Sequence, residues 1–357
     1  MTPLPNYGDS SEKTAIQAEM LGNRVKKRLK HLNKWAKRLN IGAFRLYDRD
    51  IPEIPLVLDI YGDVISGALY KRPYEKDPEQ ESVWINSMRQ VLSQSAGIEP
   101  ENVIIKQRER QTGEFQYTKT AEKGVIREIR EGNCVFKVNL SDYLDTGLFL
   151  DRRSLRTLVG GDAFGKSVLN LFCYTGSFSV YAAIGGAVST DSVDLSNTYL
   201  SWARENFALN GLNASDNYTA ESDNFGCNFV AGSDSINRLI RADVNAFLER
   251  ALERRFKWDL IILDPPAFSN SKMTRADFDL NRDYVPLLTK CLTLLSPGGK
   301  LWFSASARSF RVSAVGLEKA LRADFPRLKI ADITDKLVDE DFRGKKVPKT
   351  FTLTLIL

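Results

Sequence analysis

The feature that most constrains the fold is a regular alternation of strand-like and helix-like segments that begins at Lys166. Short apolar runs rich in Val, Ile and Leu are followed by segments with helical spacing. Alternation of this kind predicts a mostly parallel, Rossmann-like, doubly wound α/β sheet, here of seven strands. The strand-like runs are 167–174, 187–196, 236–244, 258–266, 298–306 and a closing antiparallel pair, 328–337 and 350–357, and the helix-like segments are 178–184, 197–210, 243–255 and 282–295.

The first part of the chain is organised differently. Residues 1–18 are expected to form a polar lead, and residues 19–40 have helical spacing. Strand-like segments over 44–72, a helix-like segment over 80–96 and further strands over 103–140 follow, with a turn at 131–133. We therefore expect a small α+β domain over 19–145 and the α/β domain over 146–357. Within the latter, residues 213–235 are polar and rich in Gly, Ser and Asn, which predicts a surface insertion.

The predicted helix over 19–40 is strongly basic. From Asn23 to Asn40 it contains many Lys and Arg and no Asp or Glu, although the whole chain has a net charge of only +5. Its basic face is either a solvated surface or a contact for a polyphosphate such as RNA. Residues 106–119 mix basic and aromatic residues, as RNA-binding surfaces and many ordinary hairpins do. The apolar residues form one stripe: Met20, Val25, Leu29, Leu32, Trp35, Ala36 and Leu39.

Composition excludes several classes of protein. No apolar run approaches the roughly 18 residues that cross a membrane, and residues 1–19 lack the apolar core of a signal peptide. With His31 as the one histidine, a metal site or a catalytic triad built on histidine is not expected. The cysteines are far apart and form no CxxC pair, which indicates reduced thiols in a cytoplasmic protein; they are Cys134, Cys173, Cys227 and Cys291.

The first candidate site is the segment Asn170–Ser179, which reads NLFCYTGSFS. An apolar strand here runs into a turn that contains Gly176, and a helix follows. Glycine lets the backbone approach a ligand closely, and the N–H groups of the helix N-terminus can bind it. The segment lacks the GxGxxG spacing of dinucleotide-binding folds, and an ordinary strand–helix turn has the same appearance.

Two acidic residues end the next two predicted strands. Asp194 follows Gly176 by 18 residues, where a carboxylate can accept hydrogen bonds from both ribose hydroxyls of a nucleoside cofactor. Asp243 ends the third strand and suits contact with an adenine amino group. Asp243 also precedes the helix-like segment NAFLERAL, so its carboxylate can instead cap that helix.

The most specific local signal is Asp264-Pro265-Pro266-Ala267-Phe268 after the buried strand WDLIIL. Two prolines stiffen the chain beyond the strand. They hold Phe268 over the edge of the sheet where Rossmann-like folds bind ligands. Phe268 can stack on a base that has left its helix, and Asp264 can accept a hydrogen bond from that base or position a group donor.

These motifs carry a family resemblance. NLFCYTGSFS, TDSVDLS, ENFALNGL and DLIILDPPAFSNSK resemble the large-ribosomal-subunit RNA methyltransferases. AEMLGNRVKKRLKHLNKWAKR, FRLYDRDIPE, KQRERQTGEFQYTK and YLDTGLFLDRR extend the resemblance to the RlmK-type 23S rRNA guanine-N7 methyltransferases, which are related to RlmI and form the C-terminal half of the fused RlmKL enzymes. The resemblance covers most of the chain, from about Glu19 to about Phe342, and residues 213–235 depart from the family pattern.

The resemblance implies a class I methyltransferase fold that binds S-adenosyl-L-methionine and no metal. It implies 23S rRNA, or a large-subunit assembly precursor, as substrate, and a separate THUMP-containing methyltransferase as a partner. It assigns the target base to Asp264, Pro265, Pro266 and Phe268. It assigns the cofactor to Asn170, Phe172, Tyr174 and Gly176 (methionine and ribose), Asp194 with Leu195 (ribose), Asp243 (adenine) and Asp264, with Phe149 and Arg153 approaching from the linker.

The residue types also bear on the chemistry. Guanine N7 has a lone pair and needs no deprotonation before it attacks a sulfonium methyl group, which agrees with a pocket that lacks histidine. Cytosine-C5 methylation needs a nucleophilic cysteine, and the fifth strand carries Ala305 and Ala307 instead. Together with the family resemblance, the missing cysteine makes guanine-N7 methylation of 23S rRNA the main hypothesis. Guanine-N2 or adenine-N6 methylation, or an RNA-binding assembly protein with weak catalysis, are the alternatives.

Overall fold

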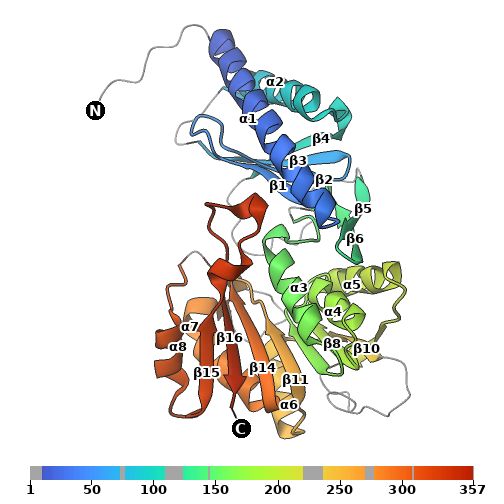
Figure 1. Ribbon diagram of the computed structural model, residues 1–357, viewed down its shortest axis with the longest axis vertical. Coiled ribbons are helices and arrows are strands. Elements are labelled where there is room, and N and C mark those ends of the chain that lie inside the picture. The colour runs from blue at the N-terminus through green and yellow to red at the C-terminus, as the bar shows by residue number, and fades with distance from the viewer. Residues whose placement is uncertain are drawn as a thin grey trace. The chain divides into compact units, whose positions relative to one another are not determined.

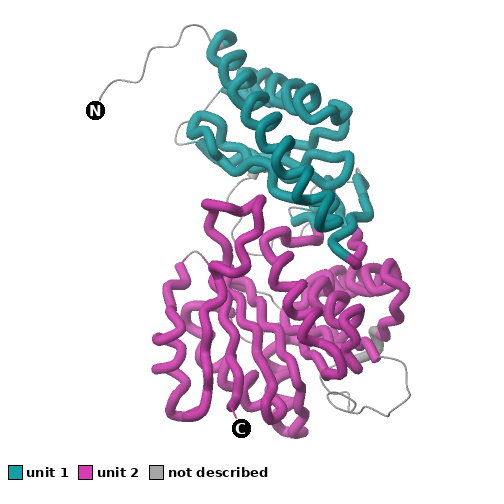
Figure 2. Tube along the Cα trace, viewed as in Figure 1, with its two compact units in different colours: residues 1–132, 138–146 teal, residues 133–137, 147–357 magenta. Residues whose placement is uncertain are grey.

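The computed structural model describes residues 10–72, 77–108, 124–143, 145–219, 236–269, 277–307 and 309–356. The chain divides into two compact units, which Figure 2 distinguishes by colour. Unit 1 comprises residues 1–132 and 138–146, and unit 2 comprises residues 133–137 and 147–357. The predicted domain boundary between residues 145 and 146 stays a prediction.

Unit 1 contains a four-stranded sheet in the order β1-β2-β3-β4. Strands β1 (Ala43–Asp48), β2 (Leu56–Tyr61) and β3 (Val64–Tyr70) are antiparallel, and β4 (Val103–Arg108) pairs in parallel with β3. This parallel pair requires a crossover, which α2 (Pro78–Ala96) provides. Figure 1 shows α1 and α2 side by side on one face of the sheet.

Helix α1 (Ser10–Arg38) begins earlier than the predicted start at residue 19, so residues 10–18 are helical and not a lead. The reason is packing in the first turns: the Gln17 side chain is buried and accepts a hydrogen bond of 2.6 Å from the indole N–H of Trp84. Residues 1–9 lie outside the described residues. A polar sequence is compatible with this helix because one stripe alone enters the core.

The α1 stripe packs as predicted at most positions. Val25, Leu29, Leu32, Trp35 and Ala36 are buried in the core of unit 1, whereas Met20 and Leu39 are exposed. A second sheet pairs β5 (Ile126–Glu131) with β6 (Cys134–Asn139), and the predicted turn between them contains Gly132 with a φ of 60°. Most of the basic and aromatic segment 106–119 lies outside the described residues.

Unit 2 is built on an eight-stranded sheet in the order β15-β16-β14-β11-β7-β8-β10-β9. Strands β9, β10, β8, β7, β11 and β14 pair in parallel, and β16 pairs antiparallel with both β14 and β15, as predicted for the closing strands. The strands are β7 (Ser167–Leu171), β8 (Ser189–Asp194), β9 (Ser215–Thr219), β10 (Ile236–Arg241), β11 (Trp258–Leu263), β14 (Leu295–Ala305), β15 (Leu328–Asp332) and β16 (Lys349–Leu355).

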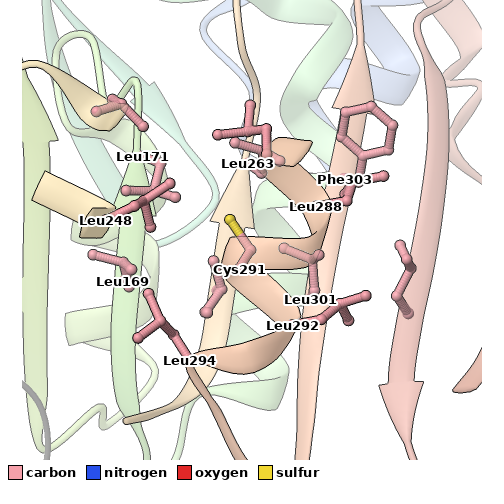
Figure 3. Packing of buried hydrophobic residues seen from close by; sticks show 14 of the residues in the cluster. Leu169, Leu171, Leu248, Leu263, Leu288, Cys291, Leu292, Leu294, Leu301 and Phe303 are labelled. Carbon is pink, nitrogen blue, oxygen red and sulfur yellow. The ribbon is translucent and has the colours of Figure 1, made fainter. Parts of the chain in front are cut away.

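Helices cover both faces of this sheet, so the α/β architecture is the predicted doubly wound one. Helices α3 (Arg153–Asp162) and α4 (Ser177–Ile184) contribute Leu155, Val159 and Phe178 to one core cluster. Helices α6 (Val244–Glu253), α7 (Leu280–Thr293) and α8 (Ala314–Leu321) contribute to the other, which Figure 3 shows around Leu263 and Cys291. Helix α5 (Asn197–Leu209) connects β8 to β9.

Seven of the strands correspond to the predicted sheet, and β9 adds an eighth at its edge. β9 occupies the start of the predicted insertion 213–235, and residues 220–235 lie outside the described residues. An edge strand has one neighbour and tolerates a polar sequence, which explains why composition indicated a loop. Helix α3 was likewise not predicted, because Gly160 and Gly161 resemble a turn. A Cβ atom at Gly160 would lie 2.9 Å from the carbonyl oxygen of Tyr181, so the glycine permits α3 to pack closely on α4.

Among the helices of the described ranges, none combines the length and hydropathy that a membrane crossing needs. The longest is α1, whose exposed face is charged.

A core substitution just below the candidate site tests the packing. Leu263 is the last residue of β11 and is fully buried in the core cluster to which α6, α7 and α8 contribute. We expect Leu263→Ala to lower the free energy of unfolding by about 3 kcal/mol, because the cavity adds to the lost burial. Urea denaturation measures this change. Leu158→Ala, at an exposed position of α3, is the control and should change stability by less than about 0.5 kcal/mol; equal losses would contradict the described core.

Candidate active site

The parallel strands β7, β8, β10 and β11 all end at the same edge of the unit 2 sheet. The loop after β7 has an unusual backbone there. Phe172, Tyr174 and Gly176 adopt positive φ angles of 54°, 53° and 75°. Gly176 is the N-cap of α4, and since it contributes no capping side chain, the first turn presents N–H groups that can bind an anionic part of a ligand.

Gly176 is also fixed by packing. A Cβ atom at this position would lie 2.9 Å from the Cβ of Ala203 on α5. The hydroxyl of Thr175 donates to the carbonyl of Gly147 at 2.7 Å, and the amide of Asn206 donates to the carbonyl of Thr175 at 2.9 Å. The loop is therefore held from both sides in the conformation that a ligand would meet.

Asp194 ends β8 and lies against this loop. One carboxylate oxygen accepts a hydrogen bond from the backbone N–H of Tyr174 at 3.0 Å, and the other accepts from the N–H of Ser196 at 2.9 Å. Burial raises the pKa of Asp194 to about 6, while the hydrogen bonds from the amides of Ser196, Tyr174 and Leu195 act in the opposite direction. An oxygen that accepts one N–H retains a lone pair for a second donor, so the carboxylate can still receive ribose hydroxyls.

Three aromatic rings gather beside Asp194. The ring centroids of Phe149 and Tyr174 lie 5.0 Å apart, and those of Tyr174 and Tyr199 lie 4.5 Å apart with an edge-to-face geometry. Phe149 is 42% exposed. The structure thus brings Phe149 to the predicted loop. Sequence reasoning missed Tyr199, whose signal was its place in the first turn of the helix after Asp194.

The DPPAF segment follows β11 at the same edge. Pro265 is buried, and Phe268 is 49% exposed on β12 (Phe268–Ser269), which pairs with β13 (Phe278–Asp279). Residues 270–276 lie outside the described residues. The backbone N–H of Leu280 donates to the carbonyl of Ala267, which joins the segment to the start of α7. This arrangement leaves the Phe268 ring accessible for stacking.

Asp264 has a partner that sequence reasoning did not single out. The guanidinium group of Arg152 donates from Nε to Oδ2 of Asp264 at 2.9 Å and from Nη2 to Oδ1 at 3.0 Å. The motif LFLDRR contains both Arg152 and Arg153, and the resemblance assigned Arg153 to the site instead of Arg152. Burial would lower the pKa of Arg152, but the carboxylates of Asp151 and Asp264 outweigh it and raise that pKa above its usual range.

Arg153 is placed differently from the prediction. It begins α3 and is buried, and its guanidinium group pairs with Asp339 and Asp341 at 3.1 Å each. A helix starts at Arg153, and successive residues of its first turn face different neighbours. Arg153 therefore ties α3 to the 3₁₀ turn Glu340–Phe342. The assignment of Arg153 to the cofactor stays a prediction.

The side chains of three further predicted residues make contacts within the protein. Asn170 is buried, and its amide donates to the hydroxyl of Ser179 at 2.9 Å, so its side chain is engaged inside the sheet. Phe172 packs its ring against Phe278 with centroids 5.6 Å apart. Asp243 caps α6 by accepting from the N–H of Ala246 at 3.0 Å, which is the alternative left open by the sequence.

The described thiols of unit 2 near the sheet are poor nucleophiles. Burial raises the pKa of Cys173 well above its usual value, and the charge of Asp194 raises it further. Burial also raises the pKa of Cys291. Both therefore remain protonated near neutral pH, and neither supplies the thiolate that cytosine-C5 chemistry requires. Within the described ranges, no cluster of three or more His, Cys, Asp or Glu side chains has the arrangement of a metal site.

Comparison with known proteins now identifies the family. Residues 45–221 match the model of S-adenosylmethionine-dependent methyltransferases. Ribosomal RNA large subunit methyltransferase K of Neisseria meningitidis serogroup B is 42% identical over 331 residues, which cover 93% of this chain and 86% of that protein. The chain belongs to this methyltransferase family. Ribosomal RNA large subunit methyltransferase K/L of Pseudomonas putida GB-1 is 42% identical over 95% of this chain, which spans only 42% of that relative.

A solved structure supports the cofactor. SMU.776, crystallised with SAH, superposes with a TM-score of 0.68 and 25% identity, and the match covers 94% of this chain and 81% of that one. The enzyme is S-adenosylmethionine-dependent, and its residues fit this cofactor. The N-terminus of α4 offers N–H groups to a carboxylate, and Asp194 offers acceptors to a ribose.

The assignment of the ribose to Asp194 is testable through pH. A carboxyl group with a pKa of about 6 is ionised above that pH and protonated below it. Because the ribose hydroxyls need an acceptor, we expect affinity for S-adenosylmethionine to weaken as the pH falls from 7 to 5, approaching about tenfold per pH unit below the pKa. Calorimetry across this range measures the effect.

Two variants control this experiment. Asp194→Ala should lose at least about tenfold in cofactor affinity while the fold survives. Asp194→Asn cannot titrate, so its weaker affinity should not change between pH 5 and 7. Wild-type affinity that is constant over the same range would contradict the assignment.

Proposed function

We propose that this enzyme methylates guanine N7 in 23S rRNA, with S-adenosylmethionine as the methyl donor. The observation that carries the proposal is the DPPAF segment at the edge of the sheet, with an exposed aromatic ring and a paired carboxylate, in a chain 42% identical to methyltransferase K. The substrate could be the mature 23S rRNA or a large-subunit assembly precursor.

The geometry supports a role for each of the candidate residues in this proposal. Gly176 and the first turn of α4 would hold the methionine end of the cofactor, with Phe172 and Tyr174 shaping that loop and Asn170 positioning it through Ser179. Asp194 and Leu195 would bind the ribose. The Asp243 carboxylate accepts one hydrogen bond that caps α6, and its remaining acceptor would face the adenine. Phe149, whose ring lies beside that of Tyr174, would cover the bound cofactor.

The chemistry asks for positioning more than for proton transfer. The N7 lone pair of guanine attacks the sulfonium methyl carbon, the bond from that carbon to sulfur breaks, and its electron pair stays on sulfur, which leaves SAH. The alignment of nucleophile and methyl group can supply much of the rate enhancement. Phe268 would stack on the extruded base and Pro265 and Pro266 would stiffen its support. Burial raises the pKa of both Cys173 and Cys291, so neither supplies a thiolate, which agrees with direct attack by the base.

Two alternatives have specific support. A DPP segment followed by an aromatic residue also suits guanine-N2 or adenine-N6, whose exocyclic amines can donate to Asp264. The basic face of α1 would also serve an RNA-binding ribosome-assembly protein with weak catalysis. N7 chemistry is favoured because the N7 lone pair needs no base, whereas an amine must lose a proton, and both oxygens of Asp264 are already engaged by Arg152.

The RNA would be bound in part by unit 1. The exposed face of α1 carries a stripe of cations at helical spacing, Lys26, Lys30, Lys34 and Lys37, flanked by Lys27 and Arg38. Such a stripe can follow the phosphates of an RNA strand. A THUMP-containing methyltransferase would cooperate with this chain, either as a separate protein or within one polypeptide, because the K/L relatives are more than twice as long as the matched region. A ribosomal substrate would place the enzyme in the cytoplasm.

Methylation in vitro tests the reaction. We expect the purified protein with S-adenosylmethionine to convert guanine to 7-methylguanine in unmodified 23S rRNA, at a site that nucleoside mass spectrometry and mapping reveal. The product N2-methylguanine or N6-methyladenine would favour the exocyclic-amine alternative. Cofactor binding without methyl transfer would favour the assembly protein. A deletion strain that keeps full 7-methylguanine at every 23S site would refute the N7 proposal.

A salt titration tests the basic face. Each phosphate contact contributes about 0.7 to 0.9 to the slope of log affinity against log salt concentration. We expect Lys30→Gln with Lys34→Gln to reduce that slope by about 1.5 and to weaken RNA binding at low salt. The control is Lys319→Gln with Lys329→Gln, which removes the same charge from exposed positions on α8 and β15. Equal effects of the two pairs would assign the salt dependence to net charge alone.

A further inference from the structure

Arg152 is a buried arginine with every nitrogen of its side chain engaged. It is 5% exposed. Its Nε and Nη2 atoms donate to the two carboxylate oxygens of Asp264, Nη2 also donates to the hydroxyl of Ser306, and Nη1 lies 3.0 Å from a carboxylate oxygen of Asp151. The fork geometry of a guanidinium group matches a carboxylate in both position and plane.

The partners of Arg152 come from separate parts of unit 2. Arg152 is the last residue of the 3₁₀ turn Leu150–Arg152, Asp264 is the first residue after β11, and Ser306 is the first residue after β14. Strands β11 and β14 are parallel neighbours, so their carboxyl ends lie side by side. One guanidinium group thus connects the turn that follows Phe149 to the start of the DPPAF segment and to the end of β14.

The charges explain why this contact matters to Asp264. A carboxylate held at 12% side-chain exposure is costly unless it is paired and hydrogen-bonded. Arg152 supplies both, and it occupies one acceptor position on each oxygen. Each oxygen keeps a second lone pair. The remaining acceptors point in directions that the guanidinium plane fixes, so Asp264 can receive an N–H donor only in a narrow range of geometry.

We propose that Arg152 is a positioning residue for methyl transfer, which fixes the Asp264 carboxylate and, through it, the DPPAF segment that receives the target base. This inference rests on the proposed function for its kinetic consequence. It predicts that Arg152 acts on the rate of transfer through Asp264, with little effect on the cofactor. A purely structural arginine would instead affect stability and leave the rate of the folded enzyme unchanged.

The kinetic test is a double-mutant cycle on the full-length protein. The variants are Arg152→Gln, Asp264→Asn and the two combined, assayed in single-turnover methylation of 23S rRNA at saturating S-adenosylmethionine. A misplacement of about 1 Å can cost about a hundredfold in rate. We therefore expect Arg152→Gln to lower the rate by about that factor, with the dissociation constant for S-adenosylmethionine changed by less than about twofold. In the Asp264→Asn background the same change should cost less than about threefold, because the residue through which Arg152 acts is already altered.

Two further variants separate positioning from stability. Arg152→Lys keeps the charge but not the fork, so it should recover part of the lost rate, about tenfold over Arg152→Gln. The matched control is Arg238→Gln, which removes a buried arginine of the same kind that pairs with Asp191 between β10 and β8. We expect this variant to lower the melting temperature as much as Arg152→Gln while the rate per folded molecule is preserved.

A readout without catalysis completes the test. Hydrogen–deuterium exchange of peptides that cover residues 258–269 and 301–307 should quicken in Arg152→Gln and not in Arg238→Gln, since the lost contacts join these segments. An unchanged exchange pattern in Arg152→Gln, or additive rate losses in the cycle, would overturn the inference. If the wild-type protein methylates no rRNA, the proposed function fails, and the exchange measurement still decides whether Arg152 fixes the DPPAF segment.

Discussion

Parallel pairing of β7 with β8 and β11 is the constraint on which the candidate site depends. Strands that run in the same direction end at the same edge, and the residues that follow them are gathered there without further contacts between the loops. This is why Gly176, Asp194 and Asp264, which are far apart in the sequence, lie at one edge of the sheet. The buried leucine and isoleucine side chains on both faces of these strands fix the register, since a slip by one residue would turn each apolar side chain to the opposite face.

The loop after β7 shows how packing imposes a backbone that local preference would not select. Positive φ angles at Phe172 and Tyr174 are uncommon for large side chains. Both rings are held by other aromatic rings, Phe172 by Phe278 and Tyr174 by Phe149 and Tyr199. The surrounding packing stabilises the strained turn, and strain of this kind concentrates where a ligand is bound. The conformation that exposes the α4 N-terminus is therefore a property of the whole unit and not of the motif NLFCYTGSFS alone.

Sequence reasoning predicted what periodicity and strand ends determine. Seven of the eight strands of the sheet, the helices α4 to α7 and the positions of Asp194 and Asp264 follow from the hydrophobic pattern and the residue after each apolar run. It failed where a choice depends on tertiary contacts. Arg152 and Arg153 are chemically identical neighbours, and only the start of α3 decides that the first meets Asp264 and the second meets Asp339 and Asp341. β9 was missed because an edge strand needs no apolar pattern, and the first turns of α1 were missed because Gln17 packs through a hydrogen bond that no hydropathy pattern records.

The two carboxylates of the site are stabilised in different ways, and this difference separates their tasks. Burial raises the pKa of Asp194 to about 6, because it outweighs the hydrogen bonds from backbone amides, which lower that pKa. The hydrogen bonds described for its carboxylate come from backbone amides. This environment favours a ligand that brings hydroxyl donors, or the positive charge of a sulfonium cofactor, close to it. Asp264 is paired with a guanidinium group through both oxygens, so its charge is already balanced and its remaining acceptors are fixed in direction. A carboxylate paired with a guanidinium group contributes geometry to the approach of a neutral base, and a carboxylate held by backbone amides contributes attraction for a cation. These two environments agree with the proposed base-binding role of Asp264 and the proposed cofactor-binding role of Asp194.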